Sequence, residues 1–193
     1  MRKPGTPLVM LLLGVVAAAL ALSGPPTGTA ASADVLAPRT TCRGQSALTA
    51  PAAVQVRAMR CLINWARRHA GQPALRRSPE LDQSAHLRGA EIRRCQDFSH
   101  TPCGEAFIVV FQLAGYPLAS VGENLAWGQG RLGTARSAMA SWLASPEHRQ
   151  NLFDPRWRDL GLARVRARSL FGRSNVTVWV AQFGQRLALA PSP

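Results

Sequence analysis

Apolar residues recur at three- and four-residue spacing in the first half of the chain, as expected for helices with one buried face. The first such segment begins at Ala52 and stops near Gly71, after a basic last turn. Its apolar stripe contains Val54, Met59, Leu62, Ile63 and Trp65. The second segment opens on Ser78-Pro79-Glu80, a capping residue followed by proline and an acid. Its predicted inner face, with small residues that allow close packing, contains Leu81, Ala85, Gly89 and Ile92.

The second half of the chain predicts shorter helices and a pair of strands. We expect a third helix over 105–114, a fourth over 134–144, and a short one that begins at Pro146 with the preceding serine as its cap. The runs 160–165 and 176–183 are rich in valine, leucine and aromatic residues, which is typical of strands. A glycine-containing turn separates these runs, so they predict an antiparallel hairpin in the core sheet.

The start of the chain has the features of a secretory signal. Two basic residues precede an apolar run from Val9 to Leu22, and Ala31-Ser32-Ala33 forms an A-x-A cleavage pattern. The run is short for a bilayer span, so we expect cleavage after Ala33, with Ala30 as second choice. The mature protein is then secreted, with no transmembrane segment. The predicted divisions are a signal peptide at 1–33, an N-terminal arm at 34–51, one folded domain at 52–186 and a loose tail at 187–193.

Export makes the four cysteines interpretable as two disulfides formed in an oxidising compartment. Cys95 and Cys103 flank a short loop and are natural partners, which would leave Cys42 in the arm to pair with Cys61. Four cysteines allow three pairings, and the sequence alone does not exclude the other two. A zinc site built from these cysteines is disfavoured because no C-x-x-C pair is present.

The formal net charge is +13, and removal of Arg2 and Lys3 with the signal leaves +11. A charge of this size favours anionic surfaces, such as acidic polymers or lipid head groups. Basic residues do not alternate with aromatic ones in a stripe, so we expect no specific nucleic-acid partner.

Two polar segments stand out as candidate chemistry. Glu123 lies between two glycines in 121–128, where close backbone approach would suit a buried, oriented carboxylate. The alternative is a turn in which this acid and Asn124 bond nearby backbone groups, or the start of a short strand. His100 lies in the loop between two cysteines, and rigid loop histidines serve as ligands or acid/base groups. Its alternative role is a hydrogen bond to loop carbonyls.

The other histidines receive simpler interpretations. His69 falls in the last turn of the first helix, where positive charge suits the helix dipole. His86 lies off the apolar face of the second helix and is expected to be exposed. His148 falls in the first turn of the short helix that begins at Pro146.

Short motifs follow one another in a set order between about Val54 and Phe183. They are Leu62-Ile63-Asn64-x-x-Arg67, Phe98-Ser99-His100, Gly122-Glu123-Asn124, Trp142-x-x-Ser145-Pro146-x-His148-Arg149-x-Asn151-Leu152 and Gly161-x-Ala163. In this order they resemble the CAP superfamily (cysteine-rich secretory, antigen 5 and pathogenesis-related 1 proteins, the SCP domain), in its compact bacterial secreted form. The resemblance implies an α+β fold, a three-layer α-β-α sandwich with a central antiparallel sheet.

The resemblance also implies a cleft lined by two histidines and two acids, which in several family members binds a divalent metal, often zinc. His100 matches the first histidine and Glu123 the first acid. The position of the second acid holds Ser145 instead, and His148 replaces a second histidine that has no clear match on a strand. Glu147 is then an extra acid at the cleft periphery, together with Ser145 and Asn124. Two imidazoles and one carboxylate are a reasonable zinc ligand set, so the predicted metal ligands are His100, His148 and Glu123.

Three functions are compatible with these residues. The first is a secreted binding module whose ligand is a lipid, cell-wall material or a partner protein, which the family resemblance favours. The second is a metal-dependent extracellular hydrolase, in which the same three residues would be catalytic. No H-E-x-x-H or G-x-S-x-G motif supports it. The third is a disulfide-stapled structural or adhesive surface domain, in which the buried cluster only joins loops.

Overall fold

A computed structural model describes residues 35–188. Its elements are α1 (Ala52–His69), β1 (Arg76–Arg77), α2 (Pro79–Cys95), η1 (Pro102–Gly104), α3 (Val109–Leu113), β2 (Leu118–Gln129), η2 (Gly130–Gly133), α4 (Ala135–Ala144), α5 (Pro146–Phe153), β3 (Asp159–Leu170) and β4 (Arg173–Arg186). The predicted signal peptide, the first residue of the arm and residues 189–193 lie outside the described residues. Within that part of the chain, no helix has both the length and the apolar character needed to span a membrane.

The four strands form one sheet in the order β1-β3-β4-β2. β3 and β4 form the predicted antiparallel hairpin, and β2 pairs antiparallel with the other edge of β4. β1 runs parallel to β3, with Arg76 opposite Asp159 and Arg77 opposite Leu160. The sheet is therefore mixed: β2, β3 and β4 are antiparallel, as expected, and the two-residue β1 adds one parallel pairing at the edge. A two-residue strand has no alternation that a sequence pattern can reveal.

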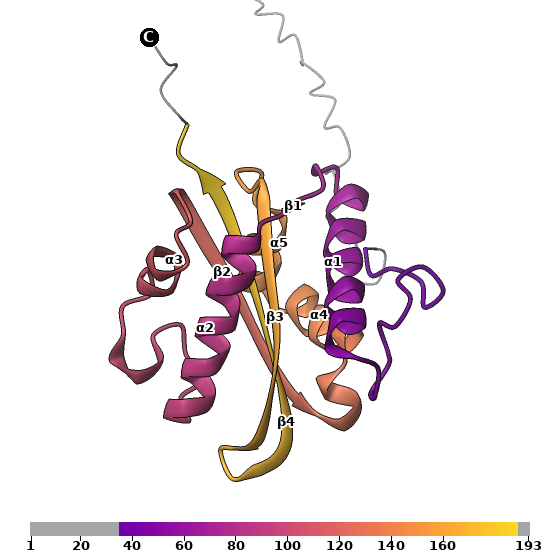
Figure 1. The fold of residues 1–193 in the computed structure, drawn as a ribbon. Helices are drawn as coiled ribbons and strands as arrows, with labels where there is room; N and C mark the ends of the chain where they lie inside the picture. Colours follow the sequence, from indigo (N-terminus) through magenta and orange to yellow (C-terminus); the bar gives the residue numbers. More distant parts are fainter. Residues whose placement is uncertain (1–34, 189–193) are drawn as a thin grey trace, which may run out of the picture.

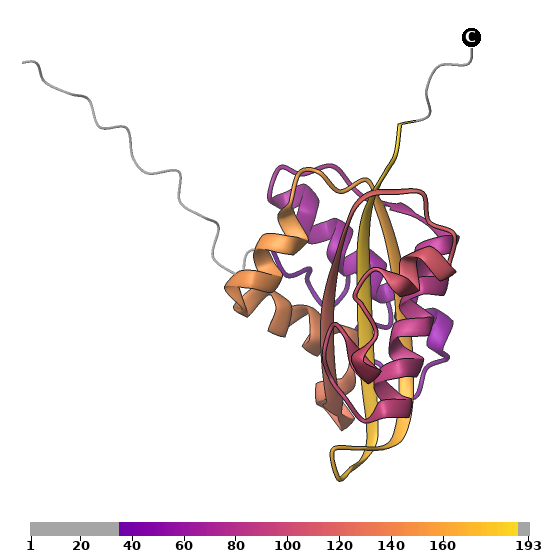
Figure 2. The same cartoon turned by 90° about the vertical axis from the view of Figure 1, so that its left-hand side faces the viewer.

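Helices cover both faces of this sheet, which confirms the three-layer α-β-α prediction (Figure 2). The alternation of side chains along β4 divides the core between the two faces. Val176, Val178 and Val180 pack with residues of α2, whereas Trp179 and Phe183 pack with residues of α1 and α4. We call these two faces of the sheet the α2 face and the α1 face, after the helices that cover them.

The inner face of α2 lies close against the sheet, as its small residues predict. A Cβ on Gly89 would lie 2.5 Å from Cγ2 of Val165 on β3. The approach is closer still at Gly161 of β3, where a Cβ would lie 2.0 Å from the carbonyl carbon of Leu81. The N-terminus of α2 also has the predicted cap, because the Ser78 hydroxyl accepts a hydrogen bond from the Leu81 amide at 3.1 Å.

Both predicted disulfides are present, Cys42–Cys61 and Cys95–Cys103. The first joins the N-terminal arm to α1, and Figure 1 shows the arm beside that helix. The second closes the loop that carries His100. A disulfide stabilises chiefly by restricting the unfolded chain, so each one also holds a local segment in place.

Two predicted segments differ from the structure. The third helix contains only Val109–Leu113, because the chain leaves η1 through two residues with positive φ, Cys103 and Gly104, and Glu105 is extended. The segment around Glu123 is neither a turn nor a short strand but the middle of β2, which has 12 residues. Its alternation is hidden in the sequence because both faces of β2 are partly covered.

Candidate functional site

Glu123 is placed by β2 and points toward the α2 face of the sheet. Side chains two apart on a strand share a face, and Leu125 packs with Ala85 and Ile92 of α2. Directly across the ladder from Glu123 lies Gln182 of β4. An acid in this position is removed from water, and its side chain has 0% exposure.

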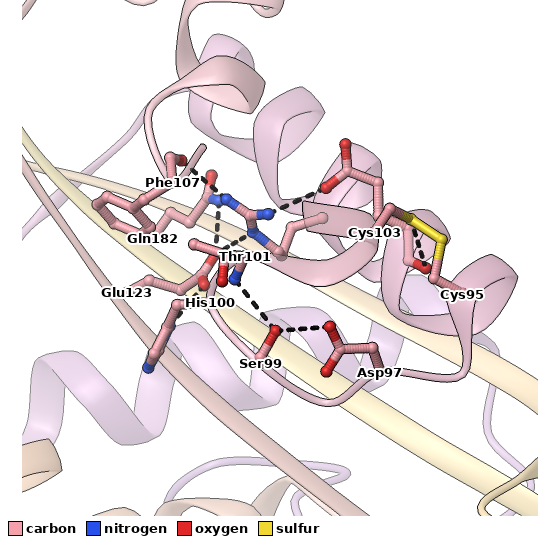
Figure 3. Close-up of polar contacts among 11 residues, drawn as sticks. Cys95, Asp97, Ser99, His100, Thr101, Cys103, Phe107, Glu123 and Gln182 are labelled. Atoms are coloured by element: carbon pink, nitrogen blue, oxygen red, sulfur yellow. Dashed lines mark hydrogen bonds and ion pairs between the residues drawn. A yellow bond between two sulfur atoms is a disulfide. The ribbon is translucent and has the colours of Figure 1, made fainter. Parts of the chain in front are cut away.

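The buried carboxylate of Glu123 receives hydrogen bonds from three other elements (Figure 3). Gln182 donates from Nε2 to Oε2 at 2.8 Å, and Arg88 of α2 donates from Nε to the same oxygen at 3.3 Å. The other oxygen, Oε1, lies 2.8 Å from Nδ1 of His100. A buried carboxylate needs such partners, since an isolated buried charge is strongly unfavourable.

Arg88 is the residue that the sequence analysis missed. It is fully buried, donates to Glu91 at 3.0 Å and to the carbonyl oxygen of Phe107 at 2.8 Å, and so joins α2 to the segment before α3. The signal was available: Arg88 follows Ala85 by three residues and precedes Ile92 by four, so it falls on the predicted apolar face. A charged residue on a buried helix face indicates a buried partner.

Burial also acts on the outer carboxylate of this cluster. Desolvation raises the pKa of Glu91, and the nearby Arg88 guanidinium opposes that rise. Arg88 therefore lies between two carboxylates, one fully buried and one partly buried.

His100 is held at the surface end of the cluster. Its loop is closed by the Cys95–Cys103 disulfide, and the Ser99 hydroxyl accepts a hydrogen bond from the Thr101 amide at 3.2 Å. The His100 side chain keeps 51% exposure although its Nδ1 is bonded to the buried Glu123. An ionised carboxylate only accepts, so Nδ1 carries the proton and Nε2 is an acceptor in the neutral ring. In Figure 3 this second nitrogen points away from the carboxylate.

His148 lies in the first turn of α5, a helix that contacts β2. Its Nδ1 lies 2.8 Å from the Ser145 hydroxyl, which explains why Ser145 occupies the N-cap position without capping a backbone amide. Burial lowers the pKa of His148, the charge of His100 lowers it further, and Glu147 opposes both. His148 is therefore mainly neutral at neutral pH, and an exposed Glu147 modulates it.

Asn124 joins α5 to β2 on the α1 face. It donates from Nδ2 to the carbonyl oxygen of His148 at 3.0 Å and accepts from Asn151 at 2.9 Å. Consecutive strand residues point to opposite faces, so Glu123 and Asn124 hold the two histidines from opposite sides of β2. The structure thus connects the predicted residues through one edge strand, and His148 is near enough to His100 to respond to its charge.

The predicted zinc ligand set can be tested on these contacts. Both oxygens of Glu123 already accept hydrogen bonds, and the Arg88 cation lies 3.3 Å from one of them. Across residues 35–188, no three His, Cys, Asp or Glu side chains are grouped so that they could hold a metal ion. Zinc bound by Glu123 would therefore have to replace one of these hydrogen bonds, and the predicted ligand set of His100, His148 and Glu123 stays a prediction. In the described structure, Glu123 orients His100.

The chemistry that remains is that of an oriented imidazole. A buried carboxylate on Nδ1 fixes the tautomer and direction of the His100 ring, and leaves Nε2 to accept a hydrogen bond or a proton. His148 is also hydrogen-bonded at Nδ1, but the Ser145 hydroxyl can donate or accept, so this contact orients the ring without fixing its tautomer.

The three-layer fold, the two disulfides and the histidine–glutamate pair together define a CAP-type domain. A model of the cysteine-rich secretory protein family (CAP) matches residues 61–183, and this chain belongs to that family. No curated protein matches the chain.

Solved bacterial structures share the fold. An extracellular protein containing an SCP domain from Bacillus anthracis is 20% identical, with a TM-score of 0.57 over 68% of this chain and 40% of that chain. An outer surface protein from Borrelia burgdorferi is 18% identical, with a TM-score of 0.62 over 72% of this chain and 97% of that one. A cysteine-rich secretory protein from Staphylococcus aureus is 13% identical, with a TM-score of 0.55 over 71% and 40%. This chain therefore spans less than half of two of these relatives, and identities this low show the fold alone.

Proposed function

We propose that this protein is an exported bacterial binding module whose ligand contacts the His100–Glu123 pair. The observation that carries the proposal is a half-exposed imidazole held at Nδ1 by a fully buried carboxylate. A network that served only to join loops would have no need to keep this ring accessible. The ring presents Nε2 in a fixed direction, as recognition of a polar ligand group requires.

Export is supported by the signal-like start of the chain and by two disulfides, which form in oxidising compartments. The similar Bacillus protein is extracellular and the similar Borrelia protein is an outer surface protein, which agrees with export. We therefore place the ligand at the bacterial surface, as cell-wall material or lipid.

The test is cosedimentation of the protein, from residue 34 onward, with purified peptidoglycan and separately with phosphatidylglycerol vesicles. His100→Gln is expected to weaken binding about tenfold, the size of one lost hydrogen bond to a charged or strongly polar group. His86→Gln is the matched control, because His86 is an exposed histidine of α2 outside the cluster. Binding that survives in His100→Gln, or that His86→Gln lowers equally, would contradict the proposal.

Salt separates this proposal from simple adhesion by charge. Binding through surface charge alone is screened at high ionic strength. Binding that depends on His100 should largely persist at high ionic strength. If high salt releases both the unmodified protein and His100→Gln completely from the sedimented material, the result would favour the adhesive domain.

Zinc binding by the two histidines stays a prediction. Titration of zinc into the demetallated protein, with Glu123→Gln and His148→Ala alongside, measures it directly. Stoichiometric zinc binding that both variants weaken would support a metal site at the two histidines. Glu123 would then contribute by orienting the His100 ring.

A hydrolase is the second candidate, and the same pair supports it. A carboxylate bonded to Nδ1 is the arrangement that makes Nε2 of a histidine a general base. Such an activity would release soluble fragments from the peptidoglycan in the sedimentation assay and would be lost in His100→Gln. If the protein sediments with peptidoglycan and releases no soluble fragments, the result would favour the binding module.

A further inference from the structure

A hollow of about 310 Å³ lies on the α1 face of the sheet, away from the His100–Glu123 pair. The N-terminal arm, the first turn of α1, η2 and the hairpin ends of β3 and β4 enclose it. Figure 1 shows the beginning of α1 beside this end of the sheet. We call this site the arginine hollow. Its polar lining includes Thr49, Gln55, Arg164, Arg166, Asn175 and Thr177.

The arginine hollow contains positive charge without neutralising acids. Arg164 and Arg166 line it, no acidic residue does, and among residues 35–188 neither guanidinium forms an ion pair. Arg164 donates to the Thr177 hydroxyl at 3.3 Å, but its buried Nε has no hydrogen-bond partner in the described part of the chain. Burial, and then the charge of Arg166, lower the pKa of Arg164. An anion placed here would satisfy the unused donor and offset the repulsion.

The arginine hollow also has an unused acceptor. Gln55 is 1% exposed and donates from Nε2 to the Ala50 carbonyl at 2.8 Å. Its Oε1 is buried and accepts no hydrogen bond within the described part of the chain. A carbonyl oxygen requires a donor, which an ionised carboxylate lacks and a hydroxyl group supplies. Thr49, Asn175 and Thr177 add neutral polar groups to the wall.

Edge protection explains part of this charge but not all of it. Among residues 35–188, β3 has no strand partner on its outer side beyond Leu160, and charged residues on such an edge prevent pairing with other chains. Exposed positions such as Arg166 and Arg168 satisfy that need. The Nε of Arg164 and the Oε1 of Gln55 are buried, so they cannot protect an exposed edge from pairing with another chain. Their lack of partners requires another explanation.

We infer that the arginine hollow binds a small sugar unit that carries a phosphate or carboxylate beside free hydroxyl groups. The anion contacts Arg164 and Arg166, and a hydroxyl donates to Gln55. A volume of about 310 Å³ lies at the lower end for small-molecule sites and suits one monosaccharide. This site is on the opposite face of the sheet from Glu123, so it does not depend on the proposed function of the histidines.

The test is calorimetric titration of the same protein with glucose 6-phosphate, glucuronate, inorganic phosphate and glucose. We expect at least one of the two anionic sugars to bind about tenfold more tightly than inorganic phosphate and glucose. Such a sugar combines an anion for the Arg164 donor with sugar hydroxyl groups for the Gln55 acceptor. Phosphate and carboxylate sources are distinguished by the first two probes. Equal affinity for inorganic phosphate, or no binding of either anionic sugar, would overturn the inference.

Variants locate the binding. Arg164→Gln and Gln55→Glu should each lower the affinity for the tighter sugar by about tenfold or more. Arg168→Gln is the matched control, since Arg168 is an exposed arginine of the same strand that does not line the arginine hollow. Arg164→Lys keeps the charge and serves if Arg164→Gln does not fold. Equal losses in Arg168→Gln and in the Arg164 variants would show general charge attraction and overturn the site.

Discussion

Replacement of Arg88 by methionine should destabilise the protein strongly, because it leaves Glu123 as a buried charge without its cation. Both side chains have 0% exposure, and the guanidinium nitrogen lies 3.3 Å from the carboxylate oxygen. Unit charges at this separation attract by about 5 kcal/mol at an effective dielectric constant of about 20. Removal of one partner from a buried pair costs about 3–5 kcal/mol.

The pairing itself is isolated by a double-mutant cycle. Glu123→Gln should cost less than Arg88→Met, because Arg88 keeps Glu91 at 3.0 Å and the Phe107 carbonyl. The double variant buries no unpaired charge at this pair, so its loss should fall short of the sum of the single losses by about 2 kcal/mol or more.

Urea unfolding with the disulfides intact measures these losses. The free energy of unfolding comes from linear extrapolation, and unchanged slopes would show that the variants unfold from the same compact state. Arg93→Met, at an exposed position of the same helix, is the control and should change stability by about 0.5 kcal/mol or less. A loss below about 1 kcal/mol in Arg88→Met, or strictly additive losses in the double variant, would refute the buried ion-pair argument.

Two further predictions concern close packing and pH. Gly161→Ala should cost about 3 kcal/mol or more in urea unfolding, because the new Cβ meets the Leu81 backbone at 2.0 Å and the strand must move away from the helix. Gly89→Ala should cost less, because the new Cβ meets a side chain, Val165, and because alanine favours the helix over glycine by about 1 kcal/mol. Equal losses in the two variants would contradict this prediction. For His148, the folded pKa lies below the unfolded value of 6.5, so the unfolded state binds more protons and stability falls as pH decreases through 6.5. His148→Gln should show a shallower fall in unfolding free energy over that range, and an unchanged or steeper fall would contradict the assigned direction.

Much of the fold was predictable because its signals are local. The cap at Ser78, the proline at the start of α5 and the glycine turn between β3 and β4 each depend on a few neighbouring residues, and all are present. The helices α1, α2 and α4 were recognised because 3.6-residue periodicity persists over several turns. The third helix was overestimated, since nothing local showed that the chain would stay extended after η1.

The site was predictable in its residues but not in its arrangement. The family motifs identified His100, Glu123 and His148, yet they suggested that all three face a common metal. The structure shows Glu123 bonded to His100 and to the unanticipated Arg88, and His148 bonded to Ser145. Composition alone could not separate a ligand carboxylate from an orienting one.

The sequence by itself determined the family, the disulfide-forming cysteines and the helix boundaries at caps. These depend on residue type and short spacing, which the chain carries wherever it folds. Only the tertiary structure decided which groups surround each side chain. The partners of Glu123 come from 35 residues before it and 59 residues after it, because α2 packs on the sheet and β2 pairs with β4. Contacts across such distances are decided by the burial of whole helices and strands against one another, and no local pattern encodes them.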